Sequence, residues 1–204
     1  MNPQDFWSAS NIDATDFVIP RVSIGQSTSV KGKPGQFNFN NGVSFESLDS
    51  CVLIVPRKTR VLYGPTNNSP SRCGSDNFYE PAARYQKPIS TNCLSCYAAA
   101  WGDDDEAKIS LAKELNRQDI KKPLCAESYN LLMADKNGQP FFISFQKTQI
   151  KLVQEKLFSR LRYEFANAKP YKIRFDMKLE RLMSQAGQPY YSVVFDNFKQ
   201  DESS

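Results

Sequence analysis

The sequence predicts a mainly β fold with one or two helices: an OB-like β-barrel interrupted by an irregular insertion. Several segments alternate apolar and polar residues with the period of a strand, and short turns rich in glycine and asparagine join some of them into hairpins. One segment with helical spacing lies between strands, and one long segment shows no period. An OB-type barrel is the simplest closed sheet with this inventory. A generic α+β sheet carrying one packed helix is the competing architecture.

The first half of the chain supplies the first strands. FVIPRVSI, from residue 17, alternates apolar and polar positions, which predicts a strand. QFNF and VSFESL lie on either side of an NNG turn at 40–42, so they are expected to form a hairpin. CVLIVPRKTRVLY, at 51–63, is the strongest strand signal in the chain.

The second half begins with the irregular segment, at about 72–126. It holds one expected helix, which starts after three aspartates at 103–105. YNLLMAD and FFISF then flank a KNGQP turn and predict a hairpin. TQIKLVQEKLFSRLRYEF has apolar residues at helical spacing, and two alternating segments around AGQ predict a final hairpin.

Length and composition indicate one large domain. The 204 residues are 40% hydrophobic and 24% charged, as in ordinary globular chains. No apolar run approaches the roughly 18 residues of a membrane-spanning helix. The first residues lack the basic and apolar regions of a signal peptide, so we expect a cytoplasmic protein without a membrane partner. We expect a flexible arm at 1–16, the domain at 17–198 and a short acidic tail at 199–204.

Histidine is absent from the sequence. This excludes Ser-His-Asp and Cys-His catalysis and the HExxH zinc motif. The nine glycines form neither a phosphate-binding GxxxxGK[ST] loop nor a dinucleotide-binding GxGxxG motif. We therefore expect a binding protein rather than an enzyme. A metal-dependent nuclease using Asp176 and Glu180 is the alternative from the enzyme class.

Four cysteines fall in or beside the irregular segment with the spacing C-x19-C-x2-C-x28-C: Cys73, Cys93, Cys96 and Cys125. Thiols stay reduced in the cytosol, and four thiolates form a closed tetrahedral Zn²⁺ site without histidine. A structural Zn²⁺ would also explain how so long an irregular segment stays folded. Scattered buried cysteines, a redox CxxC pair and an iron–sulfur cluster are the alternatives. Cys51 opens an apolar strand and is expected in the core.

Cations and aromatic residues interleave along the predicted strands, as single-stranded nucleic acid requires for phosphate contact and base stacking. The bases in the 51–63 strand are the strongest candidates, because neighbouring like charges need an anionic partner. The opposing interpretation is a solvated sheet face with its aromatic residues in the core. The candidate nucleic-acid-binding residues are Lys31, Lys33, Phe37, Phe39, Arg57, Lys58, Arg60, Tyr63, Lys172 and Arg174.

The order of these segments resembles one known family. FVIPRVSIGQSTS, KPGQF, VLIVPRKTRVLYGP, Cys73, CLSC, Trp101, PLC and SFQKT follow one another in an order similar to that of bacteriophage-type single-stranded DNA-binding proteins. The resemblance covers roughly 17–198. It implies an OB-like barrel with a zinc insertion ligated by the four cysteines, and a DNA groove lined by the bases of the 51–63 strand.

The expected function is non-sequence-specific binding of single-stranded DNA in phage replication, recombination or repair, in the host cytoplasm. Replication or recombination proteins and further copies of the chain are additional candidate partners. A zinc-stabilised protein–protein adaptor is the alternative from a third class.

Overall fold

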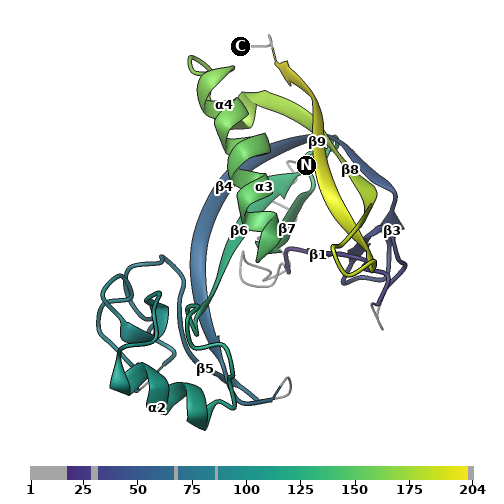
Figure 1. The fold of residues 1–204 in the computed structure, drawn as a ribbon. Helices are drawn as coiled ribbons and strands as arrows, with labels where there is room; N and C mark the ends of the chain where they lie inside the picture. Colours follow the sequence, from purple (N-terminus) through teal and green to yellow (C-terminus); the bar gives the residue numbers. More distant parts are fainter. Residues whose placement is uncertain (1–17, 29–31, 67–68, 86, 202–204) are drawn as a thin grey trace, which may run out of the picture.

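The computed structural model describes residues 18–28, 32–66, 69–85 and 87–201. Within them, one nine-stranded sheet is joined by a few helical segments, which confirms the mainly β prediction (Figure 1). The expected N-terminal arm, Lys31 and the last three residues of the expected acidic tail lie outside the described residues. No described helix combines the length and the apolar character that crossing a membrane requires.

Five strands form an OB-type barrel. The long strand β4 (Ser47–Tyr63) pairs antiparallel with both β6 (Ala126–Ala134) and β8 (Ile173–Met183). β7 (Pro140–Gln146) extends the sheet beyond β6, and β9 (Pro189–Gln200) extends it beyond β8. The order β7-β6-β4-β8-β9, with helix between β7 and β8, is that of an OB fold. Both predicted hairpins, β6–β7 and β8–β9, are therefore confirmed.

One continuous helical segment covers the barrel core. It consists of α3 (Thr148–Leu152), the π-helical stretch η2 (Val153–Phe158) and α4 (Ser159–Tyr163), which confirms the helix predicted there. Its apolar face enters the barrel core through Val153 and Leu157, both fully buried. The wider π turn is a feature that hydrophobic spacing does not reveal.

Three short strands continue the sheet at the β7 edge. β1 (Arg21–Ile24) pairs parallel with β7, and β2 (Phe37–Phe39) and β3 (Ser44–Phe45) form the hairpin predicted around residues 40–42. The Gln26 side chain then reaches β9. Its Nε2 donates to the Tyr191 carbonyl (2.9 Å) and its Oε1 accepts from the Tyr191 amide (2.8 Å), so one side chain joins the segment after β1 to the edge strand β9.

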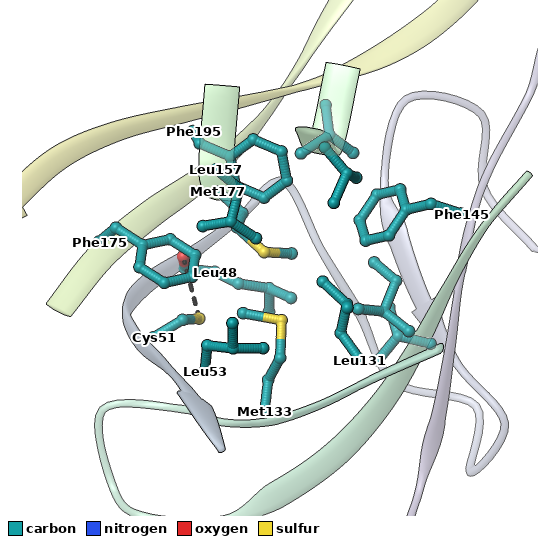
Figure 2. Close-up of a cluster of buried hydrophobic side chains, with 14 of the residues drawn as sticks. Leu48, Cys51, Leu53, Leu131, Met133, Phe145, Leu157, Phe175, Met177 and Phe195 are labelled. Carbon is teal, nitrogen blue, oxygen red and sulfur yellow. Dashed lines mark hydrogen bonds between the residues drawn. The ribbon is translucent and has the colours of Figure 1, made fainter. Parts of the chain in front are cut away.

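The barrel core is built from inward-facing side chains of every barrel strand. Figure 2 shows Phe145, Phe175 and Phe195 around Leu131 and Met133. Cys51 is fully buried among them, and its thiol donates to the Leu48 carbonyl (3.4 Å); the other labelled members are Leu53, Leu157 and Met177. Burial raises the pKa of Cys51 to about 12, so this thiol is a core residue, as expected.

The insertion lies at the far end of β4, away from the barrel (Figure 1). Its β5 (Ser71–Ser75) pairs with the end of β4, and α2 (Glu106–Glu114) is the helix expected after the three aspartates. The Asp105 side chain caps α2 by accepting from the Lys108 amide (3.0 Å). A second, small core forms here from Leu62, Cys73, Cys96, Ala98, Leu111 and Leu115. The strand β5 and the 3-10 turn η1 (Tyr97–Ala99) have no sequence period and were not predicted.

Candidate nucleic-acid interface and cysteine cluster

The three basic residues of β4, Arg57, Lys58 and Arg60, lie on two faces of the sheet, because successive strand residues point to opposite sides. Arg57 is exposed and lies opposite Asn130, which lies opposite Ser144 on β7. Ser144 donates to Asn130 (2.5 Å), and Asn130 donates to Thr59 (2.9 Å). Arg57 therefore shares its face with a polar row that crosses β4, β6 and β7.

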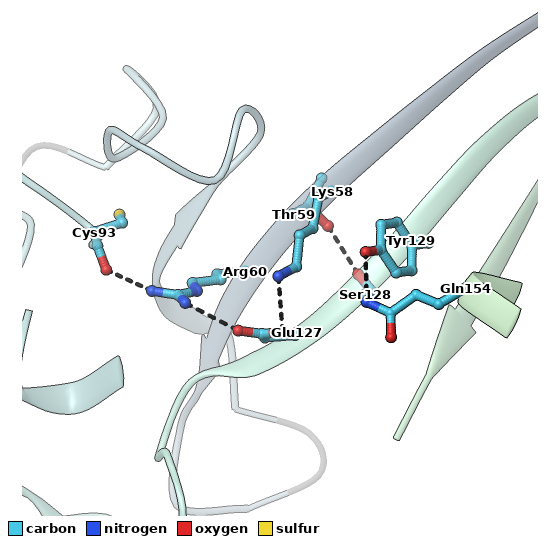
Figure 3. A network of polar contacts seen from close by, with 8 residues as sticks. All are labelled: Lys58, Thr59, Arg60, Cys93, Glu127, Ser128, Tyr129 and Gln154. Carbon is cyan, nitrogen blue, oxygen red and sulfur yellow. Dashed lines mark hydrogen bonds and ion pairs between the residues drawn. The ribbon is translucent and has the colours of Figure 1, made fainter. Parts of the chain in front are cut away.

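Lys58 and Arg60 form ion pairs within the chain. Figure 3 shows both reaching Glu127 of β6, at 3.3 Å for Lys58 Nζ and 2.9 Å for Arg60 Nη2. Both cations also lie 3.8 Å from the ring centre of Phe78, and Arg60 donates to the Cys93 carbonyl (2.5 Å). Glu127 gives both residues an anionic partner inside the chain, so the expectation that they need an external anion is wrong, although one carboxylate balances only one of their two charges. They attach the insertion to the barrel.

The other predicted cations differ in availability. Lys33 is exposed in the loop between β1 and β2, and Lys172 is half-buried in the turn η3 (Pro170–Lys172) before β8. Arg174 forms an ion pair with Asp201 (2.6 Å) and donates to the Ser50 carbonyl (3.3 Å). Its charge is therefore already compensated within the chain.

Two of the three predicted aromatic residues are packing residues. Phe37 is 0% exposed, so its ring is not accessible for stacking on a base. Phe39 is half-buried, with its ring centre 5.6 Å from that of Phe45 and 5.8 Å from that of Phe141. The prediction is wrong for Phe37, since strand periodicity does not tell a core aromatic from a surface one, whereas Phe39 also lines a hollow on the outer side of β7. Tyr63, at the end of β4, is 41% exposed and stays accessible.

Two neighbouring hollows lie along the outer side of β7. One hollow of about 830 Å³ lies over β1, β2 and β7 and includes Arg21 and Ser144. A second, of about 1390 Å³, lies between the end of β7 and the insertion. Both are lined by Gln146, so they meet there. We call the two hollows together the β7 groove.

The insertion end of the β7 groove is aromatic and basic. Its lining includes Tyr63, Trp101, Arg117 and Lys147, and all four are exposed. Lys147 directly follows β7 with a backbone φ of 54°, which is uncommon for a residue with a side chain. Sequence reasoning proposed only Tyr63 among them. A residue immediately after a predicted strand, such as Lys147, was a usable signal.

The four predicted zinc ligands lie around one small cavity of about 10 Å³: Cys73, Cys93, Cys96 and Cys125. Cys73 lies on β5, the CxxC pair precedes η1 and Cys125 precedes β6. All four are free thiols. Among the described residues, no three Cys, Asp or Glu side chains lie together in an arrangement that could hold a metal ion. Ligation would require the four side chains to turn toward one another.

Burial in this cavity favours the protonated form of two of the four thiols, Cys93 and Cys125. Burial, with smaller contributions from Cys96 and Cys73, raises the pKa of Cys125 to about 12. Burial also raises the pKa of Cys93, although a hydrogen bond with Ser75 opposes this shift. The four thiols thus lie close to the largely buried Arg60, which lines the same cavity.

Asp176, one of the two carboxylates of the nuclease alternative, has a structural role. It accepts from the Ser50 amide (2.8 Å) and from Asn197 Nδ2 (2.7 Å), at the irregular pairing of β4 with β8. Burial would raise the pKa of Asp176, but the hydrogen bonds from Asn197 and Ser50 outweigh it and lower the pKa. Both carboxylate oxygens therefore already accept hydrogen bonds. Glu180 lies on the same strand, opposite Ser192.

No family model matches the chain, and neither the curated proteins nor the solved structures contain a match. We therefore infer the function of the protein from its residues and their geometry.

Proposed function

We propose that the protein binds single-stranded DNA in the β7 groove, without sequence preference and without performing chemistry on it. The observation that carries this proposal is the groove itself: two neighbouring hollows over the outer side of an OB-like sheet, with exposed aromatic and basic residues at one end. OB folds bind oligonucleotides on this part of the sheet and on the loop after the first barrel strand. The insertion takes the place of that loop.

The distribution of cations supports this site. Arg21, Arg117 and Lys147 line the groove, and Arg57 lies two strand spacings, roughly 10 Å, from Ser144 on the same face. None of the four forms an ion pair with a described residue, whereas Lys122 of the same groove is paired with Asp119 (2.7 Å). Four phosphate contacts would make the logarithm of affinity fall with the logarithm of salt with a slope of roughly −3.

We also propose that the four cysteines hold one structural Zn²⁺. The proposal is supported by their common cavity and by the small second core, since few buried apolar residues hold the insertion together. Four sulfur donors suit Zn²⁺ and leave no ligand position open for catalysis. Bound zinc would cross-link β5, the turn before η1 and the start of β6. It would thereby fix the wall of the β7 groove that the insertion provides.

The biological setting within this proposal is replication, recombination or repair of bacteriophage DNA, as the resemblance implies. The test of the function is fluorescence anisotropy with labelled oligo-dT and with a duplex of equal length. We expect tight binding of the single strand, weak binding of the duplex and a steep salt dependence. Equal binding to both, or no binding below about 10 µM at low salt, would contradict the proposal.

A further inference from the structure

Trp101 is an unusually exposed tryptophan. It is 75% exposed although it belongs to the insertion, whose own core is small. Its side chain lines the same hollow as Tyr63, which is 41% exposed. Large aromatic side chains are normally kept from water, so one displayed in a groove indicates a contact surface.

The backbone around Trp101 is held in place from inside the insertion. Lys108 of α2 is 1% exposed, and its ammonium donates to the carbonyls of Ala100 (2.7 Å) and Gly102 (2.6 Å). These two residues flank Trp101 in the chain. Burying an ammonium group is costly unless its hydrogen bonds are satisfied, and here two of them fix a surface loop. The loop conformation is thus specified by a buried charge.

Gly102 fixes the other side of the same loop. Its amide donates to the Lys121 carbonyl (2.9 Å), and its φ of 104° belongs to the region that favours glycine. An added Cβ would lie 2.8 Å from Oδ1 of Asp104. Trp101 therefore lies between two anchored neighbours, which fixes the direction in which its side chain leaves the backbone.

The surroundings of Trp101 indicate what it contacts. The hollow also contains Arg117 and Lys147, two exposed cations without an ion-pair partner among the described residues. An aromatic face next to cations suits a nucleotide, because the ring can stack on the nucleobase while the cations contact the backbone phosphates. A partner protein would have to place acidic groups beside an apolar group to match the same surface.

We propose that Trp101 is a stacking platform for a DNA base and that Lys108 is the positioning residue that holds it. This inference rests on the proposed function and names the residues that act at one end of the β7 groove. Stacking on one aromatic residue contributes about 1–3 kcal/mol per base, equivalent to a roughly 5- to 150-fold change in affinity.

The first test uses intrinsic fluorescence. The sequence has two tryptophans and nine tyrosines, so a Trp7→Phe variant, excited at wavelengths that tyrosine does not absorb, leaves Trp101 as the sole emitter. We expect oligo-dT to quench this emission, saturating at the concentration where anisotropy saturates. We also expect Trp101→Ala to weaken oligo-dT binding at least about 5-fold. Tyr163→Ala is the matched control: Tyr163 is 74% exposed on α4 and does not line the groove, so its affinity should not change.

The second test separates positioning from contact. Lys108→Met keeps the side-chain length but removes both hydrogen bonds, so time-resolved anisotropy should show a more mobile Trp101. Its loss of affinity should not add to that of Trp101→Ala in the double variant. If Lys108→Met does not fold, Trp101→Ala and the quenching experiment still decide the matter.

The inference is overturned if the wild-type protein binds oligo-dT tightly while Trp101→Ala binds equally well and the emission stays unquenched. The proposed function would then stand with a different contact surface. Failure of the wild-type protein to bind oligo-dT would instead overturn the proposed function itself.

Discussion

Arg57 and Arg60 lie three residues apart on β4, and their replacement by alanine should have opposite consequences. Arg60 has 11% of its side chain exposed; it bonds Glu127 and the Cys93 carbonyl and lies over Phe78. Loss of these charge-assisted bonds should cost about 2 kcal/mol of unfolding free energy. For a chain of this size, that corresponds to a Tm lower by about 4–8 °C. Oligo-dT affinity, measured well below the Tm, should fall little.

Arg57 has the reverse profile. It is exposed and forms no ion pair with a described residue, so Arg57→Ala should change the unfolding free energy by less than about 0.5 kcal/mol. Loss of one phosphate contact should make the salt slope of oligo-dT binding shallower by about 0.7. Differential scanning calorimetry measures the thermal stability of both variants, and anisotropy titrations at four salt concentrations measure the salt slope of oligo-dT binding.

The opposite result, in which Arg60→Ala makes the salt slope shallower and Arg57→Ala lowers the Tm, would contradict the roles assigned to these two residues. Lys199→Ala is the control for general charge, because it removes an exposed cation of β9 that does not line the groove. It should leave the salt slope unchanged.

Three further predictions concern the rest of the molecule. One equivalent of zinc should co-purify with the protein, as measured by elemental analysis, and Cys93→Ser with Cys96→Ser should abolish it and lower the Tm. Gln26→Ala should cost about 1–3 kcal/mol of unfolding free energy in urea denaturation, because both of its bonds to the Tyr191 backbone are lost. The pKa of Asp176 is lowered in the folded state. Its stabilising contribution is therefore complete above the unfolded-state pKa of about 3.9 and is lost as the pH falls through the folded-state pKa. The Tm advantage of the wild type over Asp176→Asn should consequently shrink below about pH 4.

Each of these has a contrary result. A metal-free protein of unchanged stability would rule out the structural zinc, and iron with a visible absorption band would indicate a cluster instead. A Gln26→Ala variant as stable as the wild type would show that the contact between the segment after β1 and β9 does not stabilise the fold. A pH-independent difference for Asp176→Asn would show that its carboxylate titrates normally.

Elements with strong periodicity could be predicted from the sequence, and those that depend on distant partners could not. The β6–β7 hairpin and the helix after it follow from patterns within about 20 residues. The alternation of β4 already places Arg57 on the face opposite Lys58 and Arg60, but Glu127 lies 67 residues from Arg60 in the chain. No local pattern indicates that this carboxylate pairs with both basic residues.

The candidate site shows the same division. The cysteine spacing predicted a shared location, and the structure places all four around one cavity. Phe37 was assigned to the nucleic-acid surface because it lies close in sequence to Lys31 and Lys33, yet the β1–β2 pairing turns its ring into the core. Trp101 was noticed only within a motif. Its significance comes from Lys108, whose buried ammonium fixes the loop through tertiary contacts.

The central claim is that single-stranded DNA occupies the β7 groove. Hydrogen–deuterium exchange with and without saturating oligo-dT tests it most directly, because amide protection reports the location of binding. We expect slower exchange in 21–24, in 142–149 and around Trp101 and Arg117, with unchanged exchange in α4. Protection confined to α4 or to the β8–β9 hairpin, at oligonucleotide concentrations that saturate binding, would contradict the claim.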